Sequence, residues 1–207
     1  IDLPEAMVIE VIRACRDAGG HPHVAIRNNR ITRALVEGGD EAQYSTMAAS
    51  DLDRMKRMDA YLGLRGGFNI NEMSDVPADR LKAWGAGYMK PVHMQQRVNH
   101  TRWCVLRWPT PSMAQLAGTS TEAFEDFYFN VCTLDYVAMT EAAVKLRDRM
   151  NKTDQVHLRG PGDTDLTFSI KDIPAVACTG THNIPDGECF TAPVRDSVNG
   201  VIHFNTP

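Results

Sequence analysis

The chain has 207 residues, of which 43% are hydrophobic and 23% charged, and this composition is typical of a globular protein. Its formal net charge of -4 argues against a general affinity for nucleic acids or anionic membranes. No apolar run approaches the roughly 20 residues that cross a bilayer. We therefore expect neither a nucleic-acid partner nor a membrane partner.

The five cysteines are widely spaced and form no Cys-x-x-Cys pair. An odd number without such a pair indicates reduced thiols rather than a disulfide framework or a zinc knuckle. We therefore expect a cytoplasmic location.

Both ends of the sequence resemble interior segments. Asp2, followed by Pro4 and Glu5, is typical of the start of a helix, and the apolar run 201–205 ends just before Pro207. Because natural termini are usually polar and frayed, we expect a chain truncated at both ends.

Helices and strands alternate in the first 150 residues. Apolar residues at helical spacing predict helices over 4–18 and 41–59, from Ser74 onward, and over 121–150 as two segments meeting near Asn130. Short apolar runs predict strands over 23–26, 61–64 and 103–106, each between two successive predicted helices. This alternation is typical of an α/β domain whose sheet is mostly parallel and flanked by helices.

After residue 150 the pattern changes to strands separated by turns. The predicted strands are 156–158, 166–170, 188–192 and 201–205, and Asn199-Gly200 predicts a hairpin turn. We expect an N-terminal α/β domain over 1–154, truncated at its start. The beginning of a β-rich (α+β) catalytic domain follows over 155–207.

Glu188 is the candidate metal ligand. The turn Pro185-Asp186-Gly187 precedes it, and alternation along the strand puts Glu188, Phe190 and Ala192 on one face. A carboxylate on a rigid strand end is a good oxygen ligand for zinc, cobalt, manganese or magnesium. Spacing alone does not separate such a residue from an ordinary solvated glutamate.

The segment Asn183-Ile-Pro-Asp-Gly-Glu-Cys-Phe-Thr-Ala-Pro193, continued by Asp196-Ser-Val-Asn-Gly200, resembles the signature of the aminopeptidase T / aminopeptidase S family. These are dinuclear metallo-aminopeptidases, often described as leucyl aminopeptidases. Gly162-Asp-Thr-Asp-Leu-Thr-Phe168 is similar to the family's Thr-Asp-Leu strand, and Pro109-Thr-Pro-Ser-Met-Ala114 to its Pro-Thr loop.

The resemblance implies that Glu188 binds one of two divalent metal ions. It also implies that the whole protein removes N-terminal amino acids from peptide substrates and forms a homodimer. The family's other ligands, a glutamate, two histidines and an aspartate, are expected beyond Pro207. Because a catalytic zinc normally takes about three protein ligands, we expect this fragment by itself to be inactive.

Other residues near the motif have weaker claims. His182 and His203 flank Glu188, but isolated histidines are more often structural. Asp186 is expected to set the turn, and Asp165 to bond backbone amides of its own turn. A nucleophilic role for the Cys189 thiol lacks an evident activating group, so a small packed residue is the better interpretation.

Two further functional classes remain open from the sequence. A nucleotide-binding protein is disfavoured because the segment 63–67 lacks Gly-x-Gly-x-x-Gly spacing and no P-loop occurs. A non-catalytic interaction module or small-ligand-binding domain is the main alternative. Arg27, Arg30 and Arg33 could bind an anion or form a solvated basic face. The loop 108–111 lies beyond a strand end, where α/β proteins often bind ligands, or it only shapes a domain junction.

Overall fold

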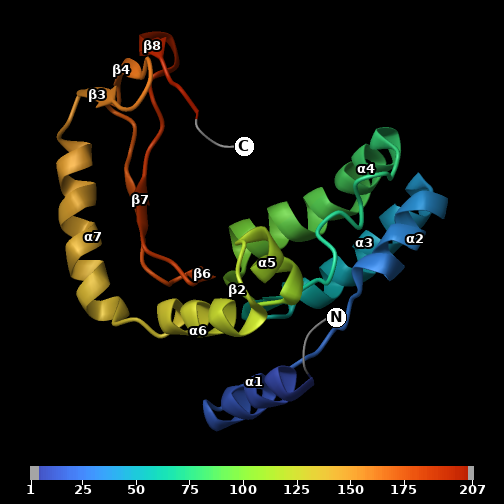
Figure 1. Cartoon of the computed structure of the whole chain (residues 1–207). Helices are drawn as coiled ribbons and strands as arrows, with labels where there is room; N and C mark the ends of the chain where they lie inside the picture. The colour runs from blue at the N-terminus through green and yellow to red at the C-terminus, as the bar shows by residue number, and fades with distance from the viewer. Residues whose placement is uncertain (1–4, 205–207) are drawn as a thin grey trace. The chain divides into compact units, whose positions relative to one another are not determined.

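The computed structural model describes residues 5–204. The chain divides into two compact units, Ile1–Phe129 and Asn130–Pro207, which are described separately below. The mixture of helices with a small parallel sheet confirms the predicted α/β class (Figure 1). In the described part no helix combines the length and apolarity that a bilayer crossing requires.

The N-terminal unit is mainly helical around one parallel pair of strands. Strand β1 (Ala60–Arg65) pairs with β2 (Arg102–Arg107) in parallel, from Ala60 opposite Arg102 to Arg65 opposite Arg107. Its helices are α1 (Glu5–Asp17), α2 (Asn29–Gly38), α3 (Glu41–Lys56), α4 (Ala78–Trp84), the π-helix η1 (Gly85–Val98), α5 (Pro111–Leu116) and α6 (Thr121–Cys132). Helix α6 continues past Phe129 into the second unit.

The core of this unit lies where α3 packs against α4 and η1. Tyr44 is buried and donates its hydroxyl to the carbonyl of Val36 at 2.9 Å. Trp84 stacks on Tyr88 with ring centroids 4.2 Å apart. Trp84 ends α4 and Tyr88 belongs to η1, and both are buried, whereas Leu81 of α4 is exposed.

Two methionines of α3, together with Met58 just after it, contribute to this core. Met55 is buried, and Met47 and Met58 pack against the cluster of buried residues. The structure therefore supports a packing role for these methionines.

The C-terminal unit consists of α7 (Tyr136–Asn151) and short antiparallel strands. One sheet has the order β3 (Gln155–Arg159), β4 (Asp165–Ser169) and β8 (Asn199–Val201). A separate pair joins β5 (Val176–Cys178) to β7 (Glu188–Phe190), and α7 packs against both of these strands. The remaining elements are β6 (Asn183–Ile184) and the 3-10 turn η2 (Arg195–Ser197).

The compact units divide before α7, whereas the domain boundary predicted from the sequence follows it, at residues 154/155. Helix α7 groups with the C-terminal unit because its packing partners are β5 and β7. The predicted catalytic domain over 155–207 remains a prediction.

Several local predictions were wrong. Residues 23–26 form no strand. Asn199-Gly200 is not a hairpin turn, because both residues belong to β8 and pair with β4. A Cβ atom on Gly200 would lie 2.1 Å from the carbonyl oxygen of Asp165, so this glycine permits close approach of two strands.

Two helices were missed. Asn28 caps α2 by accepting from the amides of Arg30 and Ile31, and α5 begins with Pro111 at its first turn. The predicted helix start at residues 2–5 extends into residues outside the described part. Of the predicted strand 201–205, Val201 belongs to β8, residues 202–204 form no strand, and residue 205 lies outside the described part.

Candidate functional site

Glu188 is the first residue of β7 and lies directly opposite Cys178 of β5. Its side chain is exposed, and within the described residues it makes no hydrogen bond or ion pair. The next residue, Cys189, points to the other face of the strand, where its thiol donates to the carbonyl of Ala143 in α7 at 3.2 Å. Helix α7 therefore covers one face of the pair, and Glu188 lies on the opposite face.

The turn before Glu188 is held by the side chain of Asp186. Its carboxylate accepts from the amide of Gly180 at 2.8 Å and from the amide of Gly187 at 3.1 Å. These contacts confirm the prediction that Asp186 sets the turn. The turn also contains a cis peptide bond between Ile184 and Pro185.

Tyr136, at the start of α7, supports the same turn. Its hydroxyl accepts from the amide of Asp186 at 3.2 Å and donates to the carbonyl of Val131 at 3.3 Å. Its ring lies close to Gly180, which has φ +83, and a Cβ atom there would lie 2.6 Å from a ring carbon. Helix α7 thus fixes the position of the strand that carries Glu188.

The carboxylates of Asp186 and Glu188 lie near the Cys178 thiol. Burial raises the pKa of the Cys178 thiol, and the charges of Asp186 and Glu188 raise it further. The carboxylates that disfavour a thiolate at this position favour a cation.

The two flanking histidines lie in different surroundings. The ring nitrogen Nδ1 of His182 lies 3.0 Å from the hydroxyl of Thr181. The amide of His203 donates to the hydroxyl of Thr164 at 3.0 Å, and its ring lies against Gly162. Neither belongs, in the described part of the chain, to a group of three or more potential metal-binding side chains.

Glu188 fits a divalent cation as a single oxygen ligand, because its carboxylate is exposed and has no described protein partner. Residues 5–204 do not bring three ligating side chains together. Among the described residues, Glu188 is therefore the single candidate metal ligand.

The expectation for Asp165 was wrong. Its carboxylate contacts the ring of His157 at 2.7 Å and lies 3.8 Å from the guanidinium of Arg159, both across the β3–β4 ladder. The hydrogen bond from His157, aided by the charges of His157 and Arg159, lowers the pKa of Asp165. Asp165 is thus part of a cross-strand polar pair.

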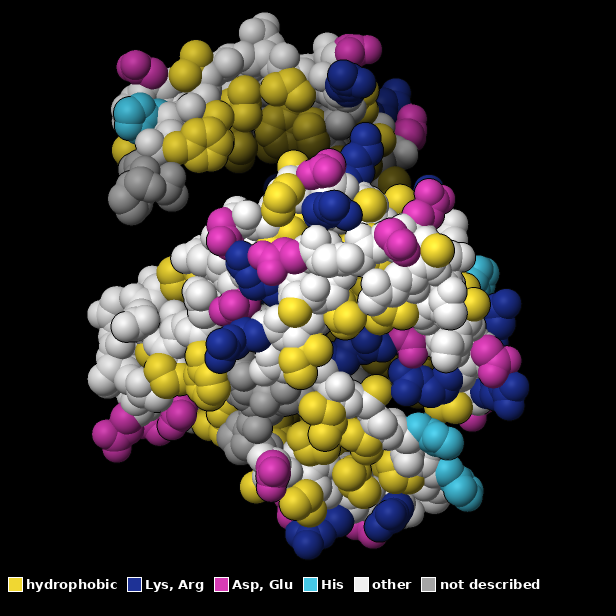
Figure 2. Space-filling model, turned by 90° about the vertical axis from the view of Figure 1, so that its right-hand side faces the viewer, with side chains coloured by type: hydrophobic (Ala, Val, Ile, Leu, Met, Phe, Trp, Pro, Cys, Tyr) yellow, Lys and Arg dark blue, Asp and Glu magenta, His cyan; other side chains and the backbone are white. Residues whose placement is uncertain are grey.

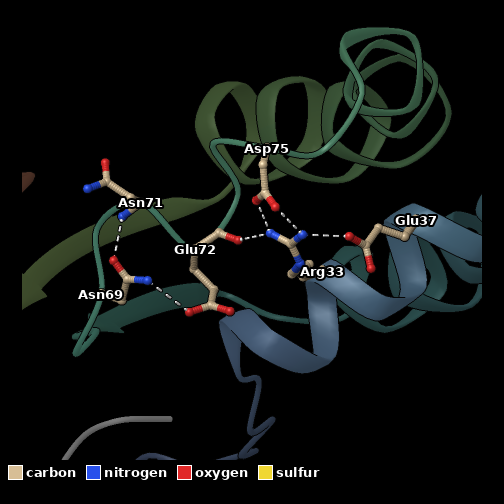
Figure 3. A network of polar contacts seen from close by, with 6 residues as sticks. All are labelled: Arg33, Glu37, Asn69, Asn71, Glu72 and Asp75. Atoms are coloured by element: carbon tan, nitrogen blue, oxygen red, sulfur yellow. Dashed lines mark hydrogen bonds and ion pairs between the residues drawn. The ribbon is translucent and has the colours of Figure 1, made fainter.

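The arginines at the start of the N-terminal unit are satisfied by acids. Arg27 pairs with Asp51. Arg33 pairs with both Asp75 and Glu37 and donates to the carbonyl of Glu72 at 2.7 Å (Figure 3). These contacts favour a structural role over an anion site for Arg27 and Arg33.

The loop 108–111 does border a pocket. It lies beyond the carboxyl ends of β1 and β2, and the residues lining it include Arg65, Gly67, Arg107 and Thr110. Sequence reasoning missed both arginines, although each one ends an apolar strand.

The sequence also matches a known protein family. A family model described as thermophilic metalloprotease (M29) matches residues 4–207. The chain belongs to the M29 family of metalloproteases. Members of this family use divalent metal ions, so the free carboxylate of Glu188 lies in a metalloprotease sequence.

A solved structure also matches the M29 chain. Wild-type AmpT from Thermus thermophilus is similar with a TM-score of 0.71 and 18% sequence identity over 93% of this chain and 55% of AmpT. At this identity the similarity shows the fold. The chain spans about half the length of AmpT. A search of curated proteins finds no match.

Proposed function

We propose that the whole protein is an aminopeptidase that releases N-terminal amino acids from peptides with two divalent metal ions, and that Glu188 binds one of them. The observation that carries this proposal is the free carboxylate of Glu188 at the start of β7, in a chain of the M29 family. The similarity of its surrounding motif to aminopeptidase T and aminopeptidase S supports the exopeptidase activity.

The residues around Glu188 position the carboxylate. Asp186 and Tyr136 hold the turn through hydrogen bonds, and Cys189 attaches the strand to α7 on the opposite face. A bound divalent cation supplies a Lewis acid that polarises a carbonyl and activates water. Because the carboxylate makes no described protein contact, it needs to break no such contact to bind a cation.

The test is Glu188→Gln in the whole protein, with metal content measured by elemental analysis and fold measured by circular dichroism. We expect a clear loss of bound metal and of aminopeptidase activity with an unchanged fold. Glu141→Gln is the matched control, since Glu141 is also exposed in the C-terminal unit and belongs to α7. Full metal content in Glu188→Gln would refute the assignment of the ligand.

The 207 residues alone are proposed to be inactive, because a catalytic zinc takes about three protein ligands and only Glu188 is assigned. Turnover of leucine p-nitroanilide by the pure 207-residue chain would contradict this. A homodimer is proposed from the resemblance alone, and light scattering of the whole protein tests it.

A further inference from the structure

The pocket beyond the carboxyl ends of β1 and β2 has a volume of about 130 Å³. Since a water molecule occupies about 30 Å³ of liquid, the pocket has room for a few waters or one small polar group. All of its lining residues lie within residues 65–113 of the N-terminal unit, and none of them is the candidate metal ligand Glu188.

Two arginines border this pocket side by side. Arg65 and Arg107 are the last residues of β1 and β2 and are partners in the parallel register. Residues in register on adjacent strands point to the same face, so two guanidinium groups are directed to one side of the sheet. Two positive charges on neighbouring strands repel each other unless an anion lies between them or water screens them.

Neither side chain has a protein partner in the described part of the chain. No side-chain hydrogen bond or ion pair joins the guanidinium group of Arg65 or of Arg107 to any residue within 5–204. Arg33, by contrast, is neutralised by two acids (Figure 3). The difference distinguishes an arginine with a structural role from a pair that is free to bind a ligand.

The surroundings of Arg65 are also positive. The pKa of His93 is lowered first by burial and then by the charges of Arg65 and Arg97. The Nε atom of Arg97 is buried without a hydrogen-bond partner, and its guanidinium lies over the ring of Tyr61. Arg65 and Arg97 therefore both place positive charge near His93, and no ion pair joins Arg97 to an acid within residues 5–204.

The floor of the pocket is rigid. The hydroxyls of Thr110 and Ser112 both donate to the carbonyl of Gly67, at 3.1 and 2.7 Å. Thr110 and Ser112 are buried and lie 2.9 Å apart, so the loop after β2 is fixed to the loop after β1.

One wall of the pocket is fixed as well. The side-chain amide of Asn69 donates to Glu72 at 3.3 Å, and the backbone carbonyl of Glu72 is held by Arg33 (Figure 3). A pocket formed before its ligand arrives loses less entropy on binding.

We propose that this pocket binds the carboxylate or phosphate group of a small anionic molecule, with Arg65 and Arg107 as the two cationic contacts. Guanidinium groups match both oxyanions because their N–H donors are planar and can bind two oxygens at once. The pocket lies where α/β sheets commonly bind ligands, outside the carboxyl ends of parallel strands.

The test is anion binding to the 207-residue chain at constant ionic strength, measured by thermal shift and by titration calorimetry. Inorganic phosphate and acetate are the probes, and chloride is the reference. We expect at least one oxyanion to raise the melting temperature, since a ligand that binds only the native state stabilises it. Stronger binding of phosphate or of acetate identifies which of the two groups the site prefers.

Arg107→Gln and Arg65→Gln should each weaken binding by about tenfold or more, the loss expected from one charged hydrogen bond. In chloride alone, the melting temperature of these variants should be no lower than that of the parent chain. Each substitution removes the repulsion between two arginines that have no acidic partner. Arg102→Gln is the matched control: Arg102 is exposed at the opposite end of β2, and its substitution should leave binding unchanged.

Two results would overturn the proposal. One is the absence of any oxyanion effect on the parent chain up to tens of millimolar, the ordinary range for a weak ion site. The other is equal binding by the parent, Arg65→Gln and Arg107→Gln, which would show that the pair is a solvated basic surface.

Discussion

The two units of this chain are stabilised by different means. The N-terminal unit has a contiguous cluster of buried apolar side chains from α2, α3, α4 and η1. In the described part of the C-terminal unit, the buried hydrophobic residues are Ile170 and Ala175. Hydrophobic side chains reach the molecular surface in Figure 2. The exposed hydrophobic residues of the C-terminal unit include Leu158, Val176, Phe190, Val201, Ile202 and Phe204.

This contrast indicates how each unit holds its functional residues. The N-terminal unit has this packed core, and hydrogen bonds from Thr110 and Ser112 to Gly67 fix the loops of the proposed anion pocket. In the C-terminal unit, hydrogen bonds from Asp186 and Tyr136 fix the strand that carries Glu188. We therefore expect large packing effects in the first unit and smaller polar effects in the second.

The largest effect is expected from Tyr44→Ala. Removing this buried ring should lower the free energy of unfolding by about 3–5 kcal/mol, because a cavity remains in the core. Urea denaturation measures it. Tyr44→Phe is the control and should cost only about 1 kcal/mol, the hydrogen bond to Val36. A loss below about 1 kcal/mol for the alanine variant would be incompatible with a packed core.

A smaller loss of stability is expected from Asp186→Ala in the C-terminal unit. Two backbone amides lose their acceptor, which should lower the free energy of unfolding by about 1–3 kcal/mol. Amide hydrogen exchange should increase at Gly180 and Gly187 and remain unchanged in α3. Asp163→Ala, on an exposed turn of the same unit, is the control for the loss of a charge. Equal exchange in the two variants would show that Asp186 does not hold the turn.

The third prediction concerns Tyr88 and Asp51 in the N-terminal unit. Burial, together with the hydrogen bond to Asp51, raises the pKa of Tyr88 to about 12. In Asp51→Asn the pKa of Tyr88 should fall part of the way toward 10, since burial remains; tyrosinate absorbance follows the titration. Asp53→Asn on the same helix is the control. No change in the Asp51→Asn titration would contradict the predicted coupling.

The same pair gives a pH dependence of stability. Burial by itself would raise the pKa of Asp51, but the hydrogen bond from Tyr88 and the charges of Arg27 and Arg54 outweigh it and lower the pKa. An acid with a lowered folded pKa stabilises the fold above its unfolded pKa, near 3.9, and loses this contribution as pH falls through the folded value. Asp51→Asn should therefore flatten the acid limb of stability below about pH 4.

The smallest effect is expected at Asp165. Its pKa is lowered mainly by the hydrogen bond from His157, so His157→Ala should raise it toward the ordinary value. Carboxyl carbon NMR titration measures this shift. Since both side chains are largely exposed, overall stability near neutral pH should change little. An unchanged Asp165 titration would show that the cross-strand contact is absent in solution.

Short-range patterns in the sequence were enough to predict the local structure around most of the candidate site. Helical periodicity located α3 and the division between α6 and α7, and the Pro185-Asp186-Gly187 turn located the start of β7 at Glu188. These features depend on residues within a few positions of one another, so composition and spacing suffice to predict them. The resemblance of the Glu188 motif agrees with the M29 family match.

Features that depend on contacts between distant residues became visible only in the folded chain. Asn199-Gly200 has the pattern of a hairpin turn, yet pairing with β4 makes it a strand. Asp165 finds its partners across a ladder, and α7 joins the second unit through contacts with β5 and β7. Arg65 and Arg107 are far apart in sequence and become neighbours only through the parallel register of β1 and β2. Register is a long-range property, so no local pattern at either arginine reveals the pocket between them.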